Sequence, residues 1–333
     1  MEVEPSAPQH VQELWFEDGN LIIQAGTSRF RVHRGVLAAR SPVFQDMLSF
    51  PQPPDAELVE GCPAVRLHDS ATDVTVFLKV IFDSSFFMSY PSETDFDIIA
   101  GCLRLSHKYE VDYLRRRALV HFSSGYCTTL AATDASDSDV LTLEWISWNR
   151  QWMAPTPAMM VILLAREVDA LWILPYAFHL LAASFKNGGM EIFHGGLYKG
   201  VPVNLSREDQ QRFLRGYHLQ QSATMTEIMG FMFDSFEIPG CCTPAICMEE
   251  RLNAFRYFRE TLALNPCIPL NTWDLDDWAV LERMCPTCLA VLKQKHQEAR
   301  QVLWDKLPSM YGLPKWEELE SLKVAAIGTN LVG

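Results

Sequence analysis

The sequence predicts an α+β fold, with an N-terminal region of strands and helices and a larger, mainly α-helical region after it. In the first region, apolar residues alternate with polar ones, as in "RFRVH", which is the period of a strand with one buried face. After residues 128–139 this alternation almost disappears, and apolar residues recur at helical spacing. The length of 333 residues is enough for about two domains.

The N-terminal region is expected to begin with strands. Residues 12–24 suggest a strand pair, or the approach to one, with Asp18-Gly19 as the turn. A cap-type serine followed by proline, Ser41-Pro42, marks the start of a helix. The expected strands are 21–25, 29–33 and 64–69, and the expected helices are 34–39, one from Ser41-Pro42, 72–82, 95–108 and 111–123.

A polar, acidic segment, "TTLAATDASDSD", divides the chain. It predicts a first domain at 12–124, a boundary loop at 125–140 and an α-helical domain at 141–325. Within the last, "GGLYKG" at 195–200 is expected to be a loop. The expected helices lie at about 139–148, 158–168, 170–186, 206–220, 223–235, 244–264, 275–306 and 315–323.

Composition and charge argue against several classes of partner. There are 28 Lys and Arg against 41 Asp and Glu, so the net charge is −13, which disfavours nucleic-acid binding. No signal peptide is visible, and the most apolar stretch, residues 159–184, is interrupted by charges and a proline, so no membrane span is expected. We therefore expect a cytoplasmic or nuclear protein with reduced cysteines.

Catalytic signatures are absent from the sequence. It contains neither a phosphate-binding Gly-Lys-Ser/Thr loop nor a Gly-x-Ser-x-Gly elbow. No residue is therefore assigned a catalytic or cofactor-binding role, and a protein that is not an enzyme is expected.

The stretch "RFRVHRGVLAARSPVFQDML", residues 29–48, carries the most specific pattern in the chain. An acidic residue precedes the first strand, a His-Arg pair ends the second, and a Leu, a Ser and a Phe follow in two helices. Over residues 12–124 this order of elements resembles the BTB/POZ family, and the detailed residue pattern resembles that of the fungal BTB proteins. The matching residues are Asp18, His33, Arg34, Leu37, Ser41 and Phe44.

The resemblance implies a fold and a function. It implies a short mixed sheet flanked by helices, with Asp18 and His33 in the buried heart of the module, so that His33 is structural. It also implies protein–protein binding, as a self-associating homodimer. The alternative is a substrate adaptor of a cullin-type ubiquitin ligase, because Leu58-Val59-Glu60 fits the apolar-x-acidic motif of that subset, with Leu58 and Glu60 as the cullin contacts.

Cysteines gather in two places of the C-terminal region. "GCCTPAIC" and "MCPTC" supply two pairs whose spacing suits one tetrahedral zinc site, and the best-spaced ligands are Cys242, Cys247, Cys285 and Cys288. Cys241 and Cys267 are the spare candidates. One structural Zn²⁺ is therefore expected, while buried reduced thiols and a redox Cys-x-x-Cys pair stay open as alternatives.

Overall fold

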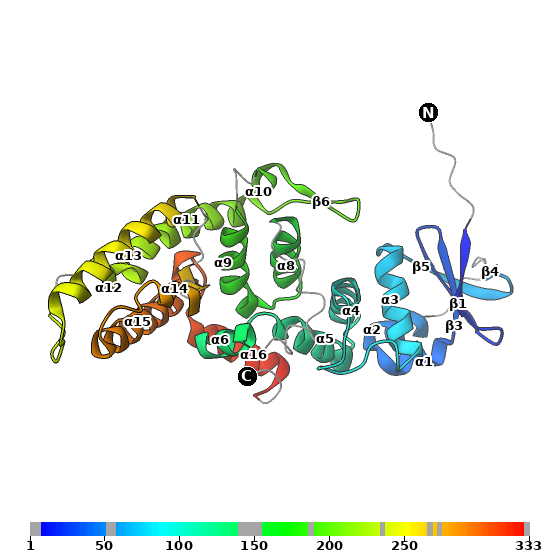
Figure 1. Ribbon diagram of the computed structural model, residues 1–333. Helices are drawn as coiled ribbons and strands as arrows, with labels where there is room; N and C mark the ends of the chain where they lie inside the picture. The colour runs from blue at the N-terminus through cyan, green and yellow to red at the C-terminus, as the bar shows by residue number, and fades with distance from the viewer. Residues whose placement is uncertain are drawn as a thin grey trace. The chain divides into compact units, whose positions relative to one another are not determined.

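The computed structural model describes residues 8–50, 58–138, 155–185, 190–233, 237–264, 269–271 and 275–329. The chain divides into two compact units, of which the first is built mainly from residues up to Gly125 and the second mainly from residues 150–325. Figure 1 shows the order of their elements along the chain. Within the described residues, no helix combines the length and the apolar character that crossing a membrane requires.

A five-stranded mixed sheet forms one part of the first unit. Its strands are β1 (Gln9–Trp15), β2 (Leu21–Ala25), β3 (Ser28–Val32), β4 (Leu58–Val59) and β5 (Cys62–Leu67), in the order β1-β3-β2-β5-β4. β2 and β3 form an antiparallel hairpin, whereas β1 pairs with β3, and β2 with β5, in parallel. The hairpin turns at Gly26, whose φ of 53° favours glycine. The expected mixed sheet is confirmed.

Helices supply many of the buried apolar side chains of this unit. They are α1 (Arg34–Arg40), α2 (Pro42–Ser49), α3 (Ala71–Phe82), α4 (Phe96–Lys108) and α5 (Asp112–Ser124). α3 packs against α4, and α4 against α5. Their inward faces follow the helical period, and fully buried examples are Val74, Leu78, Ile99, Leu103 and Leu114. Burial of such side chains is the main source of the unit's stability.

The second unit is mostly helical, as expected. Its elements are α6 (Leu130–Ser138), α8 (Pro155–Glu167), η2 (Leu171–Ile173), α9 (Leu174–Ser184), α10 (Glu191–His194), β6 (Gly196–Tyr198), β7 (Val201–Val203), α11 (Arg207–Ala223), η3 (Thr224–Ile228), α12 (Gly230–Phe233), α13 (Pro244–Leu264), η4 (Pro269–Asn271), α14 (Leu275–Ala279), α15 (Pro286–Met310) and most of α16 (Trp316–Ile327). α9 is buried on nearly all sides, as the successive residues Pro175, Tyr176, Ala177 and Phe178 illustrate.

Aromatic residues close the C-terminal end of this core. The rings of Trp304 and Trp316 stack at 5.3 Å between centroids, with 4° between their planes. The indole N–H of Trp316 donates to the carbonyl of Trp304 at 2.8 Å. Tyr311 is fully buried and stacks on Phe178 of α9 at 5.1 Å. The dense aromatic residues of α15 and α16 therefore pack inside the unit.

Three local expectations differ from the structure. The segment 125–140, expected as a boundary loop, contains α6, and residues 139–154, including the helix expected at 139–148, lie outside the described residues. "GGLYKG" is a hairpin of β6 and β7, which turns at Lys199 and Gly200 with φ values of 48° and 82°. The single helix expected at 275–306 is two helices, α14 and α15.

Candidate functional site

Ser41 joins the two helices of the recognised pattern to the rest of the first unit. It caps α2 by accepting a hydrogen bond from the Phe44 backbone N–H at 3.0 Å, while its hydroxyl donates to the Tyr109 carbonyl at 2.6 Å. The ring of Phe44 stacks on that of Tyr109 at 4.5 Å. Ser41, Phe44 and Leu37 are all buried. These three residues of the pattern therefore lie in the core.

His33 and Asp18 form a pair at the surface instead. His33 Nε2 lies 3.5 Å from Asp18 Oδ1, but the Asp18 side chain is 86% exposed and that of His33 is 32% exposed. The expectation that they lie in the buried heart of the module is wrong. Asp18 belongs to the turn before β2, where its carboxylate faces water. The His33 ring packs next to the rings of Phe16 and Phe82.

The first helix presents a small apolar face to solvent. Arg34 fixes its start, because its backbone N–H donates to the Asn20 side chain at 2.8 Å and its guanidinium donates to the carbonyl of Leu48 in α2. Beyond Arg34, the exposed residues include Gly35, Val36 and Ala39. A Cβ added at Gly35 would meet nothing within 4 Å, so this face is open.

The Leu58-Val59-Glu60 motif forms the β4–β5 hairpin. Leu58 pairs with Pro63 and is 63% exposed, whereas Val59 is buried. Glu60 turns the chain with a φ of 52°, and its carboxylate lies 3.1 Å from Nε2 of His10 in β1. The apolar and the acidic side chain of the motif are therefore both accessible.

Four cysteines converge in the second unit. The sulfurs of Cys241, Cys247, Cys285 and Cys288 all lie within 4.8 Å of one another, and the Cys241 and Cys285 sulfurs are 3.9 Å apart. Zinc–sulfur bonds of about 2.3 Å in a tetrahedron place neighbouring sulfurs about 3.8 Å apart. Three of these cysteines are buried and Cys241 is partly exposed. The cluster could hold a metal ion.

The cluster differs in one member from the set expected from spacing. Cys242 is exposed and lies outside it, and the neighbouring Cys241 takes its place. Consecutive side chains point in different directions, so only one of this pair can face the other three sulfurs. Cys242 contributes its backbone N–H instead, as a hydrogen-bond donor to Cys285. Cys267, the other spare candidate, lies outside the described residues.

Backbone N–H groups surround the sulfurs. The N–H of Cys285 donates to the Cys247 sulfur at 3.3 Å, and the N–H of Cys288 donates to the Cys285 sulfur at 3.5 Å. The N–H groups of Cys288 and Cys242 lower the pKa of the Cys285 thiol to about 6, whereas burial raises the pKa of Cys288. Donors aimed at sulfur stabilise thiolate, which is the form that binds metals.

Comparison with known proteins identifies the first unit. Residues 16–124 match the family model of the BTB/POZ domain. No significant match exists among curated proteins or among solved structures. The N-terminal part of the chain is thus a BTB/POZ domain, a non-enzymatic protein–protein interaction module, followed by a mostly helical C-terminal part.

Proposed function

We propose that this protein is a non-enzymatic interaction protein that self-associates through its BTB/POZ domain and carries one structural Zn²⁺ in its C-terminal unit. The observation that supports self-association is the exposed face of α1, where Gly35, Val36 and Ala39 offer apolar surface with little side-chain entropy to lose. An exposed apolar face of this kind suits a two-fold contact, in which each copy buries the same patch.

A second exposed apolar residue follows α2. Phe50, at the end of α2, is 69% exposed. The bond from the Arg34 guanidinium to the Leu48 carbonyl holds this end of α2 against the start of α1. An exposed aromatic ring at this end of α2 is typical of a surface that a protein partner covers.

Light scattering of the full chain tests self-association. At micromolar concentration we expect twice the chain mass of 37.9 kDa, and a Val36→Asp variant should be monomeric because two carboxylates would face each other across the two-fold axis. Met88→Asp is the matched control, since Met88 is an exposed apolar residue of the same unit in the loop after α3 and not in α1. A monomeric parent protein, or a dimeric Val36→Asp variant, contradicts the proposal.

A cullin adaptor is the second candidate. The exposed Leu58 and Glu60 at the β4–β5 hairpin support it, since an apolar and an acidic side chain are both accessible there. Purification of the tagged full chain from cells should then recover a cullin, and Leu58→Asp should abolish recovery. Failure to recover a cullin with the parent protein contradicts this alternative.

Zinc is the metal that the four cysteines favour. All four donors are thiolate-forming sulfurs, which soft and borderline metals prefer over Mg²⁺ or Ca²⁺. Four ligands with three buried suit a closed structural site better than a catalytic site, which keeps one position open. A dication also offsets the repulsion among thiolates held within 4.8 Å. The alternatives, buried thiols and a redox pair, account for neither the convergence of four sulfurs nor the donors aimed at them.

A further inference from the structure

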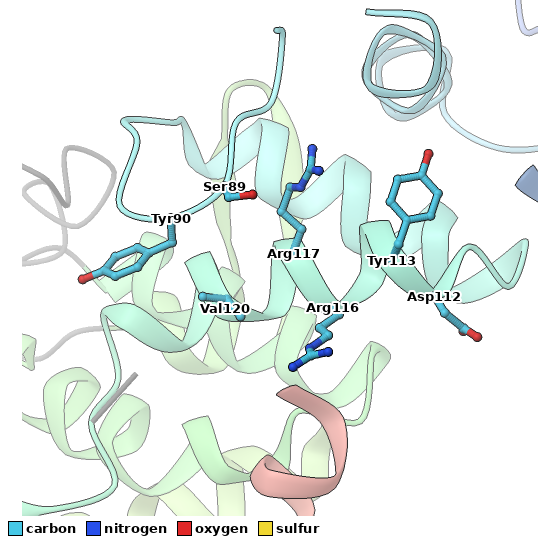
Figure 2. A pocket seen from close by; sticks show the side chains of 7 residues that line it. All are labelled: Ser89, Tyr90, Asp112, Tyr113, Arg116, Arg117 and Val120. Carbon is cyan, nitrogen blue, oxygen red and sulfur yellow. The ribbon is translucent and has the colours of Figure 1, made fainter. Parts of the chain in front are cut away.

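A pocket of about 530 Å³ lies along α5 in the first unit. Its lining residues are Ser89, Tyr90, Asp112, Tyr113, Arg116, Arg117 and Val120. Tyr113, Arg116, Arg117 and Val120 follow the i, i+3, i+4, i+7 spacing of one helical face. Figure 2 shows the side chains of the two arginines diverging from α5, with Ser89 and Tyr90 on the neighbouring loop.

Both arginines are held in place by neutral acceptors. Arg117 Nη1 donates to the Phe87 carbonyl at 2.8 Å, and Nε and Nη2 of Arg116 donate to the Ile327 carbonyl at 3.2 and 3.1 Å. A carbonyl orients a guanidinium without cancelling its charge. Asp112 is the only acidic residue among those that line the pocket. The pocket is therefore a positive site in a chain with a net charge of −13.

The rest of the lining is largely apolar. Val120 is buried, Tyr90 lies on the neighbouring loop, and Tyr113 lies nearer the start of α5. Arg40 lies over the Tyr113 ring at 5.5 Å from its centroid, which fixes that ring in position. A pocket of this size, with rings and two oriented charges, suits an apolar side chain flanked by anionic groups.

We propose that this pocket binds an acidic segment of a partner protein, which lies along α5 with carboxylates against Arg116 and Arg117 and an apolar side chain over Val120. An extended segment points every second side chain to the same side, so carboxylates two positions before and two positions after its apolar residue reach both guanidinium groups. A free anion would leave the aromatic walls uncovered. A nucleic acid would be repelled by the acidic chain as a whole.

Fluorescence anisotropy with the full chain tests the proposal. The probe is a labelled hexapeptide, Glu-Asp-Leu-Phe-Asp-Glu, and the neutral peptide Gln-Asn-Leu-Phe-Asn-Gln is the control. We expect saturable binding of the acidic peptide that weakens with salt, and a loss of about tenfold or more in the Arg116→Gln, Arg117→Gln double variant. Arg66→Gln removes the same charge from an exposed position on β5 and should bind like the parent protein.

A second variant covers the case in which the double variant does not fold. Ser89→Glu adds a negative charge to an exposed loop residue of the pocket, and it should weaken the acidic peptide but not the neutral one. Equal binding of the two peptides, or an affinity unchanged by both pocket variants, overturns the proposal. Displacement of the acidic peptide by an equal concentration of inorganic phosphate also overturns it, because a small anion would then suffice.

Discussion

Cys285 donates its backbone N–H to the sulfur of Cys247 at 3.3 Å, across 38 positions of sequence. The bond joins the N-cap of α15 to the first turn of α13, and an ion pair of 3.0 Å between Arg283 and Glu250 reinforces it nearby. The four-cysteine cluster thus ties the starts of two long helices together. A metal bound there would restrict the unfolded chain and contribute directly to folding.

The first prediction separates Cys247 from Cys242. Protein purified without added metal should contain about one zinc per chain. Cys247→Ser should lose the zinc and melt at a lower temperature, because one of four ligands is removed from a site that links α13 to α15. Cys242→Ser should keep both properties, since that side chain is exposed and outside the cluster. Elemental analysis and thermal denaturation measure the two effects.

Chelation supplies the control. A strong chelator should lower the melting temperature of the parent protein and leave that of Cys247→Ser unchanged, because the variant has no metal to lose. A metal-free parent protein whose melting is indifferent to chelator contradicts the zinc site and leaves buried thiols as the account of the cluster.

The sequence could predict that this cluster exists but not its full membership. Spacing identified Cys247, Cys285 and Cys288, because each pair had the separation of zinc ligands. Spacing could not choose between Cys241 and Cys242, since a shift of one residue barely changes the separation. The direction of a side chain in a non-repetitive loop depends on backbone angles that follow from tertiary packing.

The second prediction is that Ser41 contributes more than His33 to the stability of the first unit. Ser41→Ala should lower the free energy of unfolding by about 1–3 kcal/mol, because it removes an N-cap and leaves the buried Tyr109 carbonyl without its donor. His33→Ala should cost less than about 1 kcal/mol, since its ion pair with Asp18 is largely exposed. Urea denaturation measures both. A larger loss for His33→Ala than for Ser41→Ala contradicts this ranking.

The N-terminal fold was predictable from the sequence because several local signals agreed there. Alternation marked β3, Gly26-Thr27-Ser28 separated it from β2, and Ser41-Pro42 marked the start of α2. Burial of His33 could not be inferred, because it depends on how far the turn before β2 projects into solvent. The β6–β7 hairpin was missed because strands of three residues are too short to show a period.

A proline explains where α15 begins. Pro286 disfavours a helical conformation at the preceding residue, and Cys285 is extended, with φ −65° and ψ 149°. The apolar period continues through this break, so periodicity alone joined α14 to α15. The break places the Cys285 sulfur at the start of α15, where the N–H of Cys288 reaches it at 3.5 Å.

The third prediction concerns the close approach of α11 to the end of α15. A Cβ added at Gly216 would overlap the ring of Tyr311, which is fully buried. Gly216→Ala should therefore lower the free energy of unfolding by about 1–3 kcal/mol, despite the higher helix propensity of alanine. Ser222→Ala, at an exposed position of the same helix, should change it by less than about 0.5 kcal/mol. Equal stabilities of the two variants in urea would contradict this packing.

The last prediction is a pH dependence carried by His179. This side chain is fully buried, and its Nδ1 lies 3.0 Å from the Gln220 Oε1, which also accepts the Tyr311 hydroxyl at 2.9 Å. Burial lowers the pKa of His179 from 6.5 to about 4, against the opposing effect of the hydrogen bond to Gln220. The His179 ring is therefore protonated at a lower pH in the folded protein than in the unfolded chain.

The sign of the effect follows from that shift. Between pH 6.5 and about 4 the unfolded chain binds a proton that the folded His179 does not, so stability is fully present above 6.5 and falls as the pH decreases. The full loss is on the order of 3 kcal/mol. His179→Gln cannot titrate, so the difference in melting temperature between parent protein and variant should shrink from pH 7 to pH 4.5. The difference also cancels the titration of His296, whose pKa burial likewise lowers to about 4. Parallel melting curves over this range would show that His179 takes up a proton as readily in the folded protein as in the unfolded chain.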